Sequence, residues 1–155
     1  MPVQTNYNLH PDAGFEGQLV DGELHNTTTK TANVVLGNGL AVVRGTGDEG
    51  GTLATATGGK FVGITLRTLA GVADGADVQN YSVGESANII DFGKVYAVCE
   101  DGCVPGAAVN FRYVAGTGKL GRFTSAAVAN ETDVVPNATW ETTATAGQTA
   151  VIKLR

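Results

Sequence analysis

Charged residues are scarce in this sequence of 155 residues. Asp, Glu, Lys and Arg make up only 16% of the chain, whereas about a quarter is usual in globular proteins. The ten Lys and Arg residues are scattered, and the net charge is −5. The chain therefore has no basic block of the kind that neutralises a phosphate backbone, and we expect no nucleic-acid partner.

The sequence also lacks a segment that would direct it to a membrane. The N-terminal residues, MPVQTNYNLHPDAGF, have neither the positively charged region nor the apolar region of a secretory signal. No apolar run approaches the roughly 18 residues that a membrane helix needs. These absences predict a protein that is made in the cytoplasm and has no membrane partner.

Cysteine and histidine are rare, with two residues of each. Cys99 and Cys103 are four residues apart across a predicted turn, and His10 and His25 flank no second cysteine pair that would complete a metal site. Free thiols, a local disulfide formed on oxidation and a metal site all remain open, with free thiols favoured in a reducing cytoplasm. We predict no bound metal.

Recognisable catalytic motifs are absent as well. Gly59-Lys60 and Gly118-Lys119 are followed by Phe and Leu, where a phosphate-binding loop needs Ser or Thr. None of the three serines lies in a G-x-S-x-G turn, and the acidic pairs lie in predicted turns without the order of a calcium loop. A cysteine nucleophile with His25 as its base is left open. The sequence predicts no catalytic residue, no cofactor and no enzyme.

What the sequence does have is glycine, 22 residues of it, between short β-favouring runs. The stretch Tyr81–Phe123 predicts successive hairpin strands, with the first turn at Gly93. These strands are expected at Ala87–Phe92, Lys94–Cys99, Ala108–Val114 and Leu120–Thr124. Further strands are expected at Leu40–Arg44, Lys60–Leu66 and Ala150–Leu154. Gly63, inside one of them, indicates a bulge or a close backbone approach.

These features predict an all-β fold, either a small antiparallel β-barrel or a jelly-roll or tulip-like β-sandwich. We expect an extended N-terminal arm over residues 1–22 and a single β-rich domain over residues 23–155. Residues 23–36 are interpreted as a Thr-rich connector that leads into a short apolar run. Gly45–Gly51 is interpreted as a flexible loop tip, and Thr68–Asn80 as a loop or a single helical turn. No strand is predicted over Ser125–Gly147, where Trp140 is expected to pack in the core or at a subunit interface.

The N-terminal arm is polar and is interrupted by single apolar residues. Val3, Tyr7, Leu9 and Phe15 are spaced along it, and His10 precedes a proline, which excludes helix at that point. Such a segment could dock on a neighbouring surface by strand addition or through pockets. An ordinary first strand with a frayed end is the alternative.

Several motifs together resemble the structural cement, or head decoration, proteins of tailed bacteriophages. The resemblance covers roughly residues 35–125, and Ala107 and Ala108 stand where the family usually has Asp after a turn glycine. The segments that carry it are Gly39-Leu40-Ala41-Val42, Phe61-Val62-Gly63-Ile64-Thr65, Tyr81-Ser82-Val83-Gly84-Glu85, Ile89–Val98 and Val104–Val109.

The resemblance implies a non-enzymatic capsid protein that binds the outer surface of an expanded phage head. It implies that the protein bridges neighbouring major capsid subunits, stabilises the shell, lies on the exterior of the virion and forms a homotrimer there. On this interpretation the arm makes the contact with the capsid or a neighbour, through Pro2, Val3, Tyr7, Leu9 and Phe15, and Trp140 is a possible interface aromatic residue. A fibre- or spike-associated β-domain, or a small host β-barrel that binds a ligand or acts as an enzyme, are the alternatives.

Overall fold

The computed structural model describes residues 14–20, 22–67, 80–116 and 118–155, and this part of the chain folds into strands joined by turns, with no helix. In these ranges there is accordingly no helix with the length and apolarity needed to cross a membrane. The strands are β1 (Asn26–Ala32), β2 (Leu36–Gly37), β3 (Ala41–Arg44), β4 (Gly50–Thr52), β5 (Phe61–Thr65), β6 (Asn80–Tyr81), β7 (Ser86–Cys99), β8 (Ala108–Arg112), β9 (Phe123–Thr124), β10 (Thr132–Trp140) and β11 (Gln148–Leu154).

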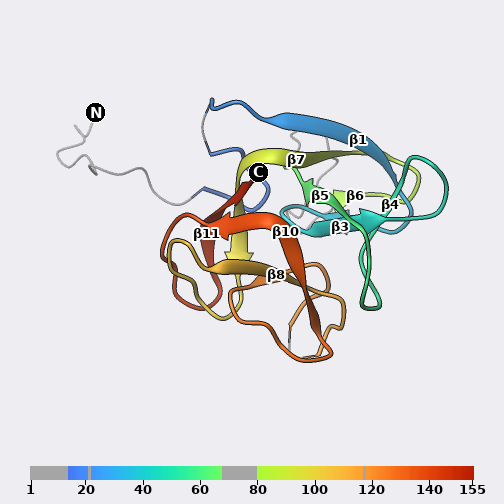
Figure 1. Cartoon of the computed structure of the whole chain (residues 1–155). Helices are drawn as coiled ribbons and strands as arrows, with labels where there is room; N and C mark the ends of the chain where they lie inside the picture. Colours follow the sequence, from blue (N-terminus) through green and yellow to red (C-terminus); the bar gives the residue numbers. More distant parts are fainter. Residues whose placement is uncertain (1–13, 21, 68–79, 117) are drawn as a thin grey trace, which may run out of the picture.

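Strand pairing closes into two circuits that share β7 (Figure 1). The first circuit runs β1-β4-β3-β5-β7 and returns to β1, and the second runs β7-β11-β10-β8-β9 and returns to β7. Among the described strands only β1–β4 and β7–β9 pair in parallel. The predicted all-β class is confirmed, and of the architectures left open the structure is a β-barrel with extra strands.

The prediction of a hairpin turn at Gly93 is wrong. β7 runs through this position as one strand of 14 residues, and Figure 1 shows it bending sharply where it passes from one circuit to the other. Gly93 has a φ of 118°, a conformation that is open to glycine and strained for other residues. The glycine therefore bends the strand. The two halves of β7 pair with distant strands, β1 and β5 before the bend and β11 after it, and not with each other.

Five strands lie where no strand was expected, among them the two-residue strands β2 and β6. β1 occupies the predicted Thr-rich connector, β10 crosses the stretch Ser125–Gly147, and β4 begins inside the predicted loop Gly45–Gly51. β1 has mostly exposed threonines, so it lacks the apolar alternation that marks a half-buried strand. β4 needs glycine at position 50 because a Cβ there would lie 2.0 Å from the carbonyl oxygen of Thr46.

Other strand boundaries differ from the prediction by a few residues. β8 ends at Arg112, and β9 contains only the last two residues of the predicted strand Leu120–Thr124. The segment 68–79 of the predicted loop Thr68–Asn80 lies outside the described residues. Gly63 behaves as predicted: the β3–β5 register shifts next to it, and a Cβ there would lie 2.3 Å from the carbonyl oxygen of Ile90.

Two apolar clusters form the core, and β7 contributes to both. Ile89 belongs to the smaller cluster, with Val42 and Tyr81, whereas Ile90 belongs to the larger one. Successive residues of a strand point to opposite faces, so adjacent isoleucines connect the two clusters. Trp140 is fully buried in the larger cluster, so packing in the core is the role that the structure gives it.

Candidate functional site

The segment 14–20 is held against the outer edge of β7. The amide of Gly17 donates to the carbonyl oxygen of Tyr96 (2.8 Å), and the amide of Tyr96 donates to the carbonyl oxygen of Gln18 (2.9 Å). Leu19 forms a β-bridge with Val95. On the other side, the amide of Arg67 donates to the carbonyl oxygen of Gly17 (2.7 Å). The chain is thus fixed between β7 and the end of β5 at the point where residues 1–13 join it.

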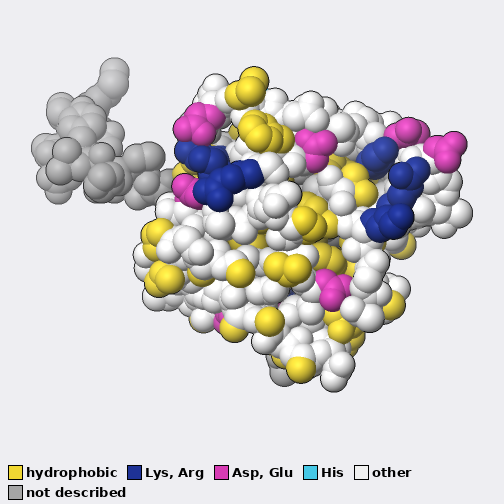
Figure 2. Space-filling view, in the orientation of Figure 1, with side chains coloured by type: hydrophobic (Ala, Val, Ile, Leu, Met, Phe, Trp, Pro, Cys, Tyr) yellow, Lys and Arg dark blue, Asp and Glu magenta, His cyan; other side chains and the backbone are white. Residues whose placement is uncertain are grey.

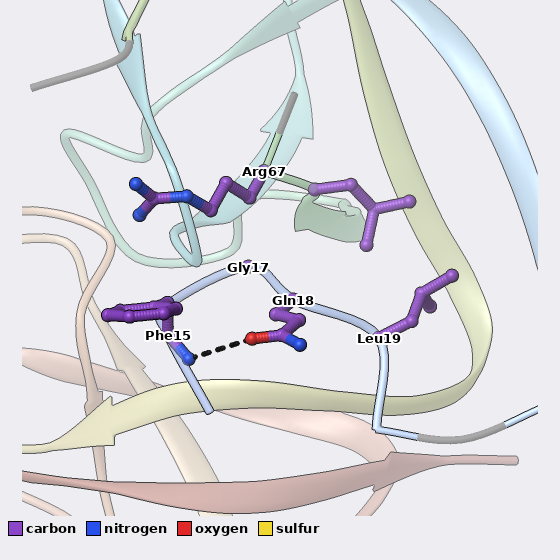
Figure 3. Close-up of a pocket in the computed structure, with 6 residues that line it drawn as sticks. Phe15, Gly17, Gln18, Leu19 and Arg67 are labelled. Carbon is purple, nitrogen blue, oxygen red and sulfur yellow. Dashed lines mark hydrogen bonds between the residues drawn. The ribbon is translucent and has the colours of Figure 1, made fainter. Parts of the chain in front are cut away.

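A cleft with a volume of about 520 Å³ opens beside this segment. Figure 3 shows the Phe15 ring and Leu19 on its lower side and the Arg67 side chain extending above Phe15. The Arg67 guanidinium carbon lies 5.1 Å from the centre of the Phe15 ring, a cation–π contact. Phe15 is 68% exposed. The cleft therefore offers an apolar surface beside the cation of Arg67, and the described residues that line it are Phe15, Gly17, Gln18, Leu19, Leu66 and Arg67.

Among the described residues that line it, the cleft has no pair of groups suited to acid–base or nucleophilic chemistry. These residues include one charged side chain, Arg67, and no Asp, Glu, His, Cys or Ser. Within the described ranges, no three His, Cys, Asp or Glu side chains come together as a metal site would require. What the cleft can do is bind an apolar group, with a carboxylate placed against the guanidinium.

The one catalytic arrangement left open by the sequence is not formed. His25 lies against Gly93, with its Nδ1 3.0 Å from the carbonyl oxygen of Glu23. Cys99 is six residues further along β7, about 20 Å at the rise of a strand. Both thiols are buried, and no disulfide joins them. Burial is the main cause that raises the pKa of Cys99, and the hydrogen bond to Asp101 adds to it. A thiol in this state is a poor nucleophile.

Of the predicted contact residues, the structure places Phe15 in the cleft. Pro2, Val3, Tyr7 and Leu9 lie outside the described residues. Arg67 and Leu66 were not predicted as site residues, because in sequence they are only the end of a strand and the residue that follows it. Their proximity to Phe15 depends on the packing of residues 14–20 against the end of β5, for which the sequence carries no local signal.

Solved structures of other proteins were compared with the fold of this chain. A chain in the structure described as the capsid of Myoviridae phage XM1 has a TM-score of 0.76 and 14% identity, with 100% of this chain and 98% of that chain covered. This likeness shows the same fold. The head fibre gp8.5 N base of bacteriophage phi29 has a TM-score of 0.46 and 11% identity, with 85% of this chain and 95% of that chain covered. That value is too low to support a fibre role.

No curated protein matches the sequence. A family model, described as the structural cement protein (E217 gp24/Pam3 gp6), matches residues 3–155, which is nearly the whole sequence. The resemblance found in the sequence is thereby confirmed well beyond the segments that first indicated it. With its β-barrel fold and the match of almost its whole length, the chain belongs to the bacteriophage structural cement proteins, components of the virion whose role in the capsid is structural.

Proposed function

We propose that this cement protein binds the outer surface of the expanded head, bridges neighbouring major capsid subunits and so stabilises the shell. The observation that supports this most directly is the fastening of residues 14–20 to β7 beside an open apolar cleft. A fixed base gives the residues before it a defined starting point on the barrel. Contacts made by the barrel and by these residues can then fall on different subunits.

The N-terminal residues can reach well beyond the segment that is fastened to β7. Thirteen residues precede Gly14, and a fully extended chain of that length spans at most about 45 Å. Its apolar anchors, Val3, Tyr7 and Leu9, alternate with polar residues, as expected for a segment that docks in pockets or adds a strand to a neighbour. We assign the capsid or neighbour contact to Pro2, Val3, Tyr7, Leu9 and Phe15.

The barrel itself is suited to decoration without uncontrolled association. Its two circuits are closed by strand pairing, so they present few unpaired strand edges of the kind that join one chain to the next. Attachment then depends on side chains and on the N-terminal arm. We propose a homotrimer on the capsid, because closed cyclic symmetry limits growth and several copies of a modest contact hold together through multivalency.

Co-sedimentation with heads of the source virus tests this function. We expect saturable binding to expanded heads, little binding to unexpanded heads and a copy number in multiples of three. Deletion of residues 1–13 and the substitution Phe15→Ala should each reduce occupancy. Val134→Ala, which truncates another exposed apolar side chain, is the matched control and should bind as the wild type does. Equal binding to both kinds of head, or none to either, contradicts the proposal.

A further inference from the structure

A second surface feature, separate from the cleft, lies where β1 begins and β7 bends. Leu24 is 83% exposed and Phe92 is 41% exposed. Together with Leu154 they border a hollow of about 260 Å³. In Figure 2 hydrophobic side chains lie beside a group of Lys and Arg side chains, close to where Figure 1 marks the C-terminus. We refer to the surface around this hollow, formed by Leu24, Phe92, Lys94, Lys153 and Arg155, as the basic–apolar patch.

A β-bulge turns Phe92 outward. In the β1–β7 ladder Asn26 pairs with Phe92 and Thr27 pairs with Ile90, so Asp91 is an extra residue without an opposite partner. Ile90 is buried, and regular alternation would turn Phe92 to the same face; the bulge instead leaves Asp91 and Phe92 both exposed. The side chain of Asn26 donates to Asp91 Oδ1 at 2.7 Å across the bulge.

The position of Leu24 also depends on a special backbone contact. The chain crosses β7 at Gly93, where a Cβ would lie 2.7 Å from the Cβ of His25. At the next position of β7, Lys94 Nζ donates to Glu23 Oε1 at 2.8 Å. The residues before and after Leu24 are thus both held against β7. The β-bulge and the close contact at Gly93 therefore place Phe92 and Leu24 on the surface. Exposed apolar area of this kind is unfavourable unless a partner covers it.

Cations outnumber carboxylates among the residues that border the hollow, although Glu141 and the exposed Asp91 lie next to them. The residues that border the hollow include three cations, Lys94, Lys153 and Arg155, and one carboxylate, Glu23, whereas the chain as a whole has 10 basic and 15 acidic residues. Lys94 pairs with Glu23, and Arg155 lies 3.7 Å from Glu141. Lys153 has no ion pair among the described residues, so its ammonium group is available to a partner.

We infer that the basic–apolar patch is a docking surface for an acidic segment of the major capsid protein, with an apolar side chain entering the hollow and carboxylates pairing with Lys153 and Arg155. This inference rests on the proposed function. Charge complementarity selects the occupant: a partner with carboxylates gains a pairing with Lys153, which has no ion pair among the described residues, and an apolar side chain covers Leu24 and Phe92. Attachment through this surface weakens as salt rises, because exposed charges are screened.

Binding of the full-length protein to expanded heads, measured over a range of salt concentrations, tests the inference. At low salt we expect Lys153→Glu with Arg155→Glu to weaken binding by about tenfold or more and to flatten its salt dependence. Leu24→Ser with Phe92→Ser should weaken binding at all salt concentrations and keep the slope. Lys60→Glu with Lys119→Glu makes the same change in net charge elsewhere and should bind within about twofold of the wild type.

The outcomes separate this inference from the proposed function. If the wild type binds expanded heads and both patch variants bind equally well, the inference is overturned and the proposed function stands. If the wild type fails to bind heads at all, the proposed function itself fails. Light scattering tests the other possible occupant, a second copy of this chain. Self-association that is lost in the patch variants, with head binding unchanged, would make the patch a contact between copies. That result would overturn the assignment to the capsid protein.

Discussion

The backbone of Gly93 lies directly against His25, so close that a Cβ on Gly93 would be 2.7 Å from the Cβ of His25. This contact occurs at the bend where β7 passes from one circuit of strands to the other. One glycine therefore has two roles. It lets a single strand serve both circuits, and it lets residues 23–25 cross that strand and present Leu24.

Gly93→Ala should be strongly destabilising. The substitution introduces a Cβ both at a φ of 118° and against His25, and we expect the free energy of unfolding to fall by about 3 kcal/mol. Gly84→Ala is the matched control, because Gly84 has a φ of 86° with no atom near its Cβ position; it should cost about 1 kcal/mol. Urea denaturation measures both. Equal losses would show that the contact with His25 is unimportant.

Arg112 should be a second point of sensitivity. Its guanidinium is buried, and it donates to the carboxylates of Glu100 and Glu131. Glu100 also accepts a hydrogen bond from the amide of Lys119 at 2.9 Å, so this cluster ties the loop after β8 to the end of β7. Arg112→Met leaves two carboxylates without their cation and should lower the free energy of unfolding by about 3 kcal/mol.

The exposed Arg44 provides the comparison for that loss, because within the described part of the chain its side chain donates only to the backbone oxygen of Asp48. Arg44→Met should change stability by less than about 0.5 kcal/mol in the same urea titration. Similar effects of the two substitutions would mean that the Arg112 cluster contributes no more than a surface side chain does.

The sequence was most informative where strands are marked by local chemistry. The runs around Val42, Ile64 and Ile152 are apolar and contain several β-branched residues, and each became a strand. Two of the family motifs, Gly39–Val42 and Phe61–Thr65, lie in the first two of these runs, and residues of all three runs belong to the core. The all-β class and the close approach at Gly63 could be predicted for this reason.

The sequence was least informative where pairing over long distances decides the structure. β10 contains Pro136 and Asn137, with a φ of 54° at Asn137, and both residues normally argue against a strand. It forms because its first part pairs with β8 and its last part with β11. The cleft and the basic–apolar patch could not be predicted for the same reason, since each joins residues that only the folded chain brings together.

Acid should weaken the fold partly through Asp101. Burial acts to raise its pKa, but hydrogen bonds from the amides of Ala126 and Ser125, both at 2.8 Å, outweigh it and lower the pKa. This stabilisation is present above the ordinary pKa of about 3.9 and is lost as the pH falls through the lower pKa of the folded state.

Asp101→Asn isolates that contribution. The variant should be less stable than the wild type at pH 7 by about 1 kcal/mol, and the difference should shrink as the pH falls below about 4. Chemical denaturation at a series of pH values measures it. A difference that stays constant down to pH 2 would show that the Asp101 carboxylate is not responsible.

The two thiols should be unreactive in the folded protein. Burial raises the pKa of Cys103 as well as that of Cys99, so few thiolates form near neutral pH. Ellman's reagent should label neither cysteine rapidly in the native state and both in urea. Because the unfolded thiols ionise near pH 8.5, stability should fall as the pH rises above that value. Rapid labelling of the native protein would contradict the buried, protonated state.

The central claim, that this cement protein stabilises the shell, is tested most directly by the melting temperature of expanded heads. Calorimetry of heads with and without saturating protein gives the shift. We predict a higher melting temperature for decorated heads, because a ligand that binds only the assembled shell stabilises it by mass action. The increase should be smaller with the deletion of residues 1–13. Saturated heads that melt at the temperature of bare heads would contradict the account.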